Sequence, residues 1–371
     1  MTDLIPPLVS DGQVVAEVNG CLGLITLNRP QALNALSLAM IRDMMALLGH
    51  WAGRPEIQAV AVLGAGREGK PPAFCAGGDI RFFHQAAHAG DPALEDFFTE
   101  EYRLNHLIHQ FPKPYVALMD GVVMGGGMGI SQGAKLRVLS DHSKLAMPET
   151  GIGLFPDVGG GWFLAQCPGH VGEWLALTGH VIAAGDAIEW GLGDVYVRSE
   201  QWPALIEDLR HGEQSSAEHV VATVMERADL APVSAPKATL DRIDRHFGQP
   251  TLAAILESLA GADDEWSRQT LATLHKRSPL MMAVTLELVR RGRQLSLADD
   301  LRLERDLVHH AFHLRGAARS ETVEGIRALA VDKDHAPRWN PATVAAIDAA
   351  ELAAFFVSPW PAGQHPLKDL K

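Results

Sequence analysis

The chain has 371 residues, of which 47% are hydrophobic and 21% are charged, and its formal net charge is −13. This length allows one large domain or a core with a smaller unit, and the composition is typical of a globular protein. The acidic balance disfavours nucleic acid as a partner, and no apolar run approaches the roughly 18 residues that cross a bilayer, so we expect no membrane partner either.

The first half of the chain alternates between strand-like and helix-like segments. Residues 14–19 and 22–28 predict a hairpin that bends at Gly20–Cys21. Apolar residues at helical spacing predict a helix over residues 37–48, with Ser37 as its N-cap. This alternation favours an α/β layer architecture. Short apolar runs predict the buried strands of a mostly parallel sheet at residues 57–64, 115–119 and 135–140.

After about residue 201 the chain becomes rich in charged residues, alanine and leucine at helical spacing. We therefore expect a core over residues 12–205, a helical region over 206–345 and a partly ordered tail over 346–371, which is loosest from Pro359. The predicted helices of the second half cover residues 217–229, 251–261, 264–276, 280–291 and 297–312.

Three nucleotide-binding or nucleophile motifs occur without the structural context that each needs. Residues 64–69 read G-x-G-x-x-G and, with Lys70, also G-x-x-x-x-G-K, but Pro71 and the proline after it prevent the helix that would present its N-terminus to a phosphate. Residues 129–133 read G-x-S-x-G, yet Ser131 falls inside a predicted helix rather than on the strand-to-helix turn. We therefore interpret Ser131 as a structural residue.

A glycine-rich turn follows the buried strand at residues 115–119, which residues 122–124 would extend. Gly125–Gly127 allow the backbone to turn tightly, and a helix is expected over residues 128–136. Backbone N–H groups at such a turn, directed by a helix N-terminus, can hold a developing oxyanion.

Two carboxylates follow this turn in the sequence. Glu149 comes directly after a proline, and Asp157 follows in the segment Phe155–Gly160. An oxyanion donor with two nearby carboxylates is suited to acyl chemistry.

The residues around these groups resemble the crotonase (enoyl-CoA hydratase/isomerase) superfamily and, within it, the 3-hydroxyisobutyryl-CoA hydrolases. The resemblance implies an α/β fold of the crotonase type, a spiral of βα units with a helical C-terminal region. The similar segments keep the family order and cover most of the chain: residues 25–40, 73–83, 113–129, 146–164 and 324–341.

The resemblance implies that the N–H groups of Gly78 and Gly126 form the oxyanion hole and that Glu149 is a catalytic carboxylate. Hydratases of the family use a second glutamate two residues after the triple glycine, a position that Gly129 occupies here. The hydrolases instead carry an aspartate where this chain has Asp157. A turn residue or helix N-cap is the alternative interpretation of Asp157, and a solvated loop carboxylate is that of Glu149.

Further candidate substrate-binding residues also come from the resemblance. Glu101 matches a glutamate that lines the substrate pocket, although a charge on a helix surface is a serious alternative. Arg67 and Lys70 are additional candidates for the nucleotide phosphates, although such loop residues are usually only solvated. The candidate contacts to coenzyme A are Asn28, Arg29, Ala32, Leu33, Ala76 and Asp79.

These residues predict hydrolysis of a short 3-hydroxyacyl-CoA, with 3-hydroxyisobutyryl-CoA from valine breakdown as the substrate that the resemblance implies. No metal or redox cofactor is expected, because coenzyme A is part of the substrate. Two alternatives stay open: a hydratase or isomerase that uses Glu149 as its only glutamate base, and a non-catalytic protein of this fold that binds coenzyme A. Gln31 and the segment Thr322–Gly325 depart from the usual family motifs, and these departures motivate the second alternative.

Other properties are less constrained by the residues. Cys21, Cys75 and Cys167 are too widely spaced for a zinc or disulfide framework, and no histidine is placed to activate Cys75. Residues 1–13 lack the features of a signal or transit peptide, so we expect a cytoplasmic location. Superfamily members often form trimers or hexamers, so a homo-oligomer is open.

Overall fold

The computed structural model describes residues 4–233 and 235–371, which group by their contacts into two compact units. Unit 1 comprises residues 1–78, 103–145 and 182–234 within that described range, and unit 2 comprises residues 79–102, 146–181 and 235–371. Because the chain passes between the units several times, they do not coincide with the linear division predicted at residue 205. The contact units do not test whether the chain has separate domains, so the division at residue 205 stays a prediction.

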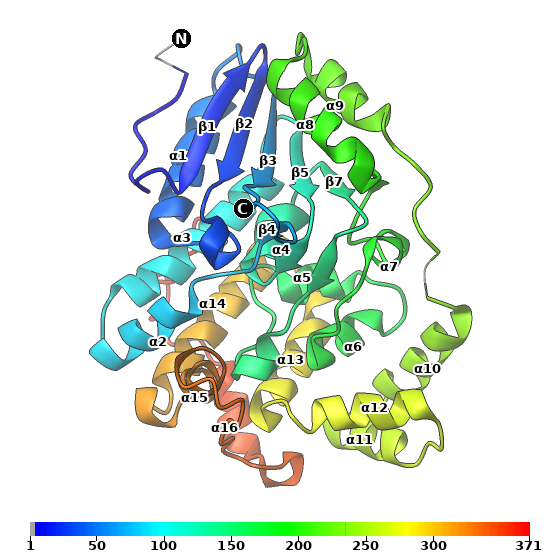
Figure 1. The fold of residues 1–371 in the computed structure, drawn as a ribbon. Helices are drawn as coiled ribbons and strands as arrows, with labels where there is room; N and C mark the ends of the chain where they lie inside the picture. Colours follow the sequence, from blue (N-terminus) through cyan, green and yellow to red (C-terminus); the bar gives the residue numbers. More distant parts are fainter. Residues whose placement is uncertain (1–3, 234) are drawn as a thin grey trace. The chain divides into compact units, whose positions relative to one another are not determined.

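The main sheet of unit 1 has six strands in the order β1-β2-β3-β5-β7-β9 (Figure 1). The hairpin is confirmed, since β1 and β2 pair antiparallel with Val14 opposite Leu27, and the remaining neighbours pair in parallel. This mixed sheet confirms the α/β class. The strands are β1 (Val14–Asn19), β2 (Leu22–Leu27), β3 (Ala59–Gly64), β5 (Tyr115–Met119), β7 (Leu136–Leu139) and β9 (Val195–Tyr196).

A second, three-stranded sheet has the order β4-β6-β8, with β4 at Ala73–Cys75, β6 at Val122–Met124 and β8 at Lys144–Ala146. The sequence suggested that residues 122–124 extend β5, but they form the separate strand β6 of this second sheet. The chain turns at Gly121, whose φ is +85°, and a Cβ there would lie 2.1 Å from the Pro72 carbonyl oxygen. Only glycine fits this close approach.

The helices of unit 1 pack around the main sheet, with α1 against β1 and β2 and α8 against β1 (Figure 1). Helix α1 begins as predicted, because the Ser37 hydroxyl accepts a hydrogen bond from the Met40 N–H. The helix predicted over residues 128–136 instead covers Gly126–Gln132, since the Lys135 N–H already donates to the Tyr115 carbonyl and the chain enters β7. The helices are α1 (Leu38–Ala52), α4 (Gly126–Gln132), α7 (Ala184–Glu189), α8 (Trp202–His211) and α9 (Ala217–Met225).

Unit 2 is built from helices, among which α13 lies against both α5 and α6. The predicted helices of the second half are confirmed, and Thr251, Asp264 and Ser296 cap three of them through side-chain oxygens. Helix α3 (Ala93–His109) belongs to unit 2 as far as Tyr102. The other helices are α2 (Ile80–Ala89), α5 (Gly160–Ala165), α6 (Val171–Thr178), α10 (Lys237–Phe247), α11 (Leu252–Ala260), α12 (Glu265–Leu274), α13 (Pro279–Gly292), α14 (Leu297–His313), α15 (Glu321–Ile326) and α16 (Ala349–Phe355).

The C-terminal tail is packed within unit 2, although the sequence predicted it to be partly ordered. Leu367 is fully buried, and the Arg302 guanidinium donates hydrogen bonds to the carbonyls of Leu367 and Leu370. Phe355 on α16 is buried as well. In the described part of the chain, no helix is both long and apolar enough to cross a membrane.

Candidate active site

The glycine loops predicted to form the oxyanion hole lie against each other in unit 1. A Cβ built on Gly77 would lie 3.5 Å from the Gly126 nitrogen, and one on Gly127 would lie 2.3 Å from the Cys75 carbonyl oxygen. Side chains at these positions would therefore separate the two loops. This close approach explains why both loops consist largely of glycine.

Both predicted donors present an unpaired backbone N–H group. Gly126 is the first residue of α4, where an α-helix leaves its N–H groups without an intrahelical acceptor. Across residues 4–233 and 235–371, neither the Gly78 nor the Gly126 N–H donates a hydrogen bond to the protein. Each group is therefore available to a carbonyl oxygen of a substrate.

The first motif packs next to the Gly78 loop, because the Ala76 N–H donates to the Leu33 carbonyl over 3.1 Å. Asn34, which the sequence analysis did not single out, organises this region. Its buried side chain donates to the Ala73 and Ala65 carbonyls and accepts from the Arg29 N–H. In the sequence, the available signal was a polar asparagine among apolar residues.

The other predicted contacts to coenzyme A divide between the units. Asn28 donates from its side chain to the Gly12 carbonyl, and Ala32 lies in the short 3-10 helix Pro30–Ala32 of unit 1. Asp79 belongs to unit 2 and caps α2, since its carboxylate accepts from the Phe82 N–H over 3.3 Å. The roles of these residues toward coenzyme A stay predictions, as do those of Arg67 and Lys70 in the loop between β3 and β4.

The three candidate carboxylates come together in unit 2. Glu149 begins a 3-10 helix (Glu149–Ile152), Asp157 lies in the loop before α5, and Glu101 lies on α3. All three residues are buried, with relative exposures of 6%, 5% and 2% in that order. The alternatives of a solvated loop residue for Glu149 and a surface charge for Glu101 are therefore wrong. Asp157 is no helix N-cap either, since Gly159 occupies that position.

Burial and mutual repulsion hold these carboxyl groups toward their neutral forms. Desolvation, followed by the charges of Asp157 and Glu149, raises the pKa of Glu101 well above its ordinary range. Desolvation and the Asp157 charge raise the pKa of Glu149 in the same way. One oxygen each of Glu149 and Glu101 is buried without a hydrogen-bond partner among the described residues. Such orphaned oxygens at a clustered site are typical of groups that bind a ligand.

Asp157 differs from its two neighbours because a tyrosine binds it. The Tyr102 hydroxyl donates to Asp157 Oδ2 over 2.8 Å, and Tyr102 is fully buried. Desolvation raises the pKa of Asp157 to about 6, while the hydrogen bond from Tyr102 lowers it. Sequence reasoning missed Tyr102, although it directly follows Glu101.

A second pair of acids lies behind the Asp157 loop and was also missed. Asp300 and Glu304 on α14 are fully buried and accept hydrogen bonds from N–H groups at the start of α5. Their spacing of one helical turn, on the same face as the buried residues Leu301 and Val308, was the available sequence signal.

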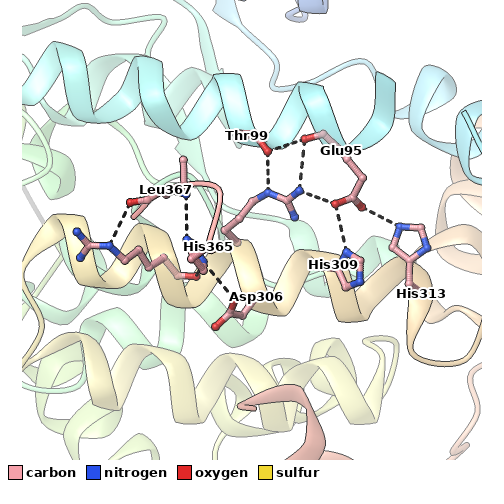
Figure 2. A network of polar contacts seen from close by, with 9 residues as sticks. Glu95, Thr99, Asp306, His309, His313, His365 and Leu367 are labelled. Atoms are coloured by element: carbon pink, nitrogen blue, oxygen red, sulfur yellow. Dashed lines mark hydrogen bonds and ion pairs between the residues drawn. The ribbon is translucent and has the colours of Figure 1, made fainter. Parts of the chain in front are cut away.

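The described residues contain one group of histidines and acids with the spacing of a metal site, namely Glu95, His309 and His313. Figure 2 shows both imidazoles pointing at the Glu95 carboxylate from α14. The Arg305 guanidinium already pairs with the same carboxylate at 2.5 Å. We therefore interpret this group as an ion-pair network between α3 and α14.

The structure shows that the G-x-S-x-G motif and the glycine motif after β3 lack the surroundings of a catalytic or phosphate-binding site. The Ser131 side chain is buried and donates to the Gly127 carbonyl over 2.8 Å, which confirms the structural interpretation. Residues 65–72 form no helix after β3, so the glycine motif there has no helix N-terminus to present.

Comparison with known proteins gives a consistent picture. The profile of the enoyl-CoA hydratase/isomerase family matches residues 22–356. The chain is 39% identical over 355 residues to the mitochondrial 3-hydroxyisobutyryl-CoA hydrolase of Xenopus tropicalis, covering 94% of this chain and 90% of that protein. The human protein of the same name is 37% identical over 356 residues, covering 93% and 89%.

Two solved structures are similar over nearly the whole chain. A carnitinyl-CoA dehydratase from Mycobacterium thermoresistibile is 36% identical with a TM-score of 0.86, covering 96% of this chain and 99% of that one. An enoyl-CoA hydratase from Rhodobacter sphaeroides 2.4.1 is 38% identical with a TM-score of 0.81, covering 94% and 98%.

Proposed function

Since this chain belongs to the enoyl-CoA hydratase/isomerase family, we propose that it hydrolyses 3-hydroxyisobutyryl-CoA to the free hydroxy acid and coenzyme A. The observation that carries the proposal is the buried group of Glu101, Glu149 and Asp157, combined with a glycine at position 129. The hydrolases named above are similar to this chain over 93–94% of its length, which supports the same activity here. A role in valine breakdown follows from that substrate.

In this proposal, the two glycine loops supply the groups that polarise the thioester. The N–H groups of Gly78 and Gly126 donate to the carbonyl oxygen and stabilise the negative charge that develops on it. One such donor is typically worth about 10²–10³ in turnover. The thiolate of coenzyme A is a good leaving group, so its departure needs little further assistance.

Glu149 and Asp157 are the carboxylates of the proposed reaction. Glu149 either attacks the carbonyl carbon, which breaks the C–S bond and leaves a mixed anhydride for water to hydrolyse, or removes a proton from the attacking water. Asp157 orients that water or the substrate hydroxyl. Because desolvation and the charge of Asp157 raise the pKa of Glu149, the carboxyl groups share a proton near neutral pH and can return it to the leaving thiolate.

Glu101 is proposed to bind the 3-hydroxyl group of the substrate. Its buried Oε1 has no hydrogen-bond partner in the described chain, and a hydroxyl could satisfy it. A substrate without that hydroxyl would leave the oxygen unsatisfied, which would favour the hydroxylated thioester.

A hydratase or isomerase is the second candidate, because the two similar solved structures are named as a hydratase and a dehydratase. Gly129 argues against it, since a glycine cannot transfer the second proton that hydration requires. Parallel incubation with crotonyl-CoA and 3-hydroxyisobutyryl-CoA, following free thiol and enoyl absorbance, separates the two. Thiol release from the second substrate alone supports hydrolysis, and loss of enoyl absorbance without thiol supports hydration.

Location, further ligands and assembly stay proposals. The two relatives are named as mitochondrial proteins, so they do not support our expectation of a cytoplasmic location. Fractionation of cells that express the chain tests it. The proposed reaction uses an acyl-CoA substrate and needs no separate cofactor, and light scattering of the purified protein would determine whether it forms a homo-oligomer.

A further inference from the structure

Two buried acids on α14 bind the first turn of α5. Glu304 accepts hydrogen bonds from the Gly159 N–H over 2.7 Å and from the Gly161 N–H over 3.0 Å. Asp300, one turn earlier, accepts from the Trp162 N–H over 2.9 Å. The two carboxylates therefore satisfy three backbone donors that a helix start leaves unpaired.

Close packing brings these acids to α5. A Cβ on Gly161 would lie 2.4 Å from Asp300 Oδ1, and one on Gly292 would lie 2.0 Å from the Gly161 carbonyl oxygen. Gly161 thus leaves room for the Asp300 carboxylate beside the backbone of α5, and Gly292 lets α13 pack against the same turn.

The segment that these acids bind carries Asp157 directly before a residue in a strained conformation. Val158 has a φ of +58°, a left-handed conformation that is rare for a β-branched residue, and Gly159 follows with a φ of +89°. A strained residue of this kind persists only when surrounding contacts enforce it. The first N–H group that donates to Glu304 is that of Gly159, directly after the strained residue.

The pair has no cation to offset its burial. No lysine, arginine or histidine of the described chain forms an ion pair with Asp300 or Glu304, and Asp300 Oδ1 is buried without a partner. Desolvation raises the pKa of Asp300 to about 7 and that of Glu304 well above its ordinary range. Two buried acids without a cation are costly to a fold even when backbone N–H groups bind them, so stability alone explains the pair poorly.

Contacts within unit 2 link the Asp157 loop to α3 and α14, and these two helices also contact each other. Tyr102 on α3 donates to Asp157, the backbone after Asp157 donates to Glu304 on α14, and Arg305, the next residue of α14, pairs with Glu95 on α3. In the last link the Arg305 guanidinium donates to the Thr99 hydroxyl over 3.0 Å as well as to the Glu95 carboxylate, and Figure 2 shows Glu95 and Thr99 side by side on α3. Asp157 is therefore held from both sides by two helices that are themselves joined.

We propose that Glu304, supported by Asp300, is a positioning residue that fixes the strained Asp157 loop in its reactive geometry. This inference rests on the proposed hydrolase function, in which Asp157 orients water or the substrate hydroxyl. Glu304 itself acts through the backbone of Gly159 and Gly161 and contacts no reacting atom. Displacement of a reacting group by about 1 Å can cost roughly 10²-fold in rate.

The first test measures the backbone without any substrate. In Glu304→Gln one carboxylate oxygen becomes an NH2 group, which cannot accept a hydrogen bond, so at least one α5 N–H loses its partner. We expect faster amide hydrogen exchange at Gly159 and Gly161 than in the wild type. Asp300→Asn is the second variant, with its effect expected at Trp162. The matched control is Asp299→Asn, an exposed carboxylate on the same helix.

The second test measures hydrolysis of 3-hydroxyisobutyryl-CoA. Glu304→Gln should lower kcat by about 10²-fold with little change in KM, whereas Asp299→Asn should leave both unchanged. In an Asp157→Asn background, Glu304→Gln should lower the residual kcat further by less than about threefold, because the group that it positions is already gone.

The outcomes separate the possibilities. An unchanged kcat, unchanged amide exchange, or an equal loss of kcat in both backgrounds would overturn the positioning role, since a purely structural role gives additive losses. If the wild type releases no thiol from the substrate, the proposed function fails, while amide exchange still determines whether Glu304 holds the loop.

Discussion

The Tyr102 hydroxyl donates a hydrogen bond to the Asp157 carboxylate over 2.8 Å, and both side chains are buried. This contact joins helix α3, which also carries Glu101, to the loop before α5. It distinguishes Asp157 from Glu149 and Glu101, each of which has a buried oxygen without a partner in the described chain. The hydrogen bond from Tyr102 therefore favours the ionised form of Asp157.

Removal of that hydrogen bond should shift the pH dependence of hydrolysis. The Tyr102 hydroxyl lowers the pKa of Asp157, which burial raises to about 6, so Tyr102→Phe should raise this pKa further. We expect the acidic limb of the kcat/KM profile to move to higher pH, with a several-fold loss near pH 6. Tyr115→Phe is the matched control, because the Tyr115 hydroxyl is also buried but has no partner among the described residues. An identical profile for both variants would contradict the role of Tyr102.

Substitution of Glu149 should remove most of the turnover. Glu149→Gln keeps the shape of the side chain but can neither attack the thioester nor accept a proton, so we expect a loss of about 10²–10⁴-fold in kcat. Binding of coenzyme A, measured by calorimetry, should persist. A variant that retains wild-type turnover would exclude Glu149 as the reactive carboxylate.

Isotope labelling determines which role Glu149 plays. In a single turnover in ¹⁸O-water, attack by Glu149 followed by hydrolysis of the mixed anhydride at the Glu149 carbonyl passes solvent oxygen into the enzyme carboxylate, which mass spectrometry of the peptide detects. Direct attack by water labels only the product acid. Both outcomes are compatible with hydrolysis, and label in the Glu149 carboxylate identifies that residue as a nucleophile.

Asp157→Asn should stabilise the protein at neutral pH. Burial raises the pKa of Asp157 from 3.8 to about 6, so the native state binds a proton more tightly than the unfolded state, and the free energy of unfolding falls as pH rises between those values. Removing the carboxyl group should therefore increase the free energy of unfolding at pH 7–8 by about 1–3 kcal/mol. Thermal denaturation of the variant and the wild type at pH 4 and pH 8 measures this difference in the free energy of unfolding, which should be smaller at pH 4. A destabilised variant at pH 8 would show that the Tyr102 contact outweighs the cost of burial.

A side chain at Gly126 should impair polarisation of the thioester. Gly126→Val places a branched group beside the N–H that is proposed to bind the carbonyl oxygen, and we expect a loss of about 10²–10³-fold in kcat. The control is Gly49→Ala on α1, where an added Cβ meets no atom within 4 Å. An undiminished rate for Gly126→Val would show that the oxyanion hole lies elsewhere.

Glu101 should determine preference for a hydroxylated substrate. Glu101→Gln should raise KM for 3-hydroxyisobutyryl-CoA more than for isobutyryl-CoA, because only the former offers a hydroxyl to the buried oxygen. Glu100→Gln, at the neighbouring position on α3, is the control. Equal effects on both substrates would remove Glu101 from recognition of the hydroxyl.

Local sequence determined much of the architecture. The hairpin at Val14–Leu27, the Ser37 and Thr251 helix caps and the α/β class follow from apolar spacing and side-chain capping, interactions that span only a few residues. Family motifs also placed Glu149, Asp157 and the two glycine loops among the candidate residues. Helix α4 was predicted to continue to residue 136. This prediction was too long, because the end of the helix depends on strand pairing, which local propensity does not contain.

The tertiary structure alone decided which acids are buried together and what holds them. Tyr102 and Asp157 are 55 residues apart, and Glu304 binds an N–H group 145 residues away in the chain. Such contacts depend on the packing of α3, α5 and α14, so a charged residue on a predicted helix looks the same in the sequence whether it faces solvent or an active site. Burial then sets the pKa values, because desolvation and repulsion between acids exist only after the chain has folded.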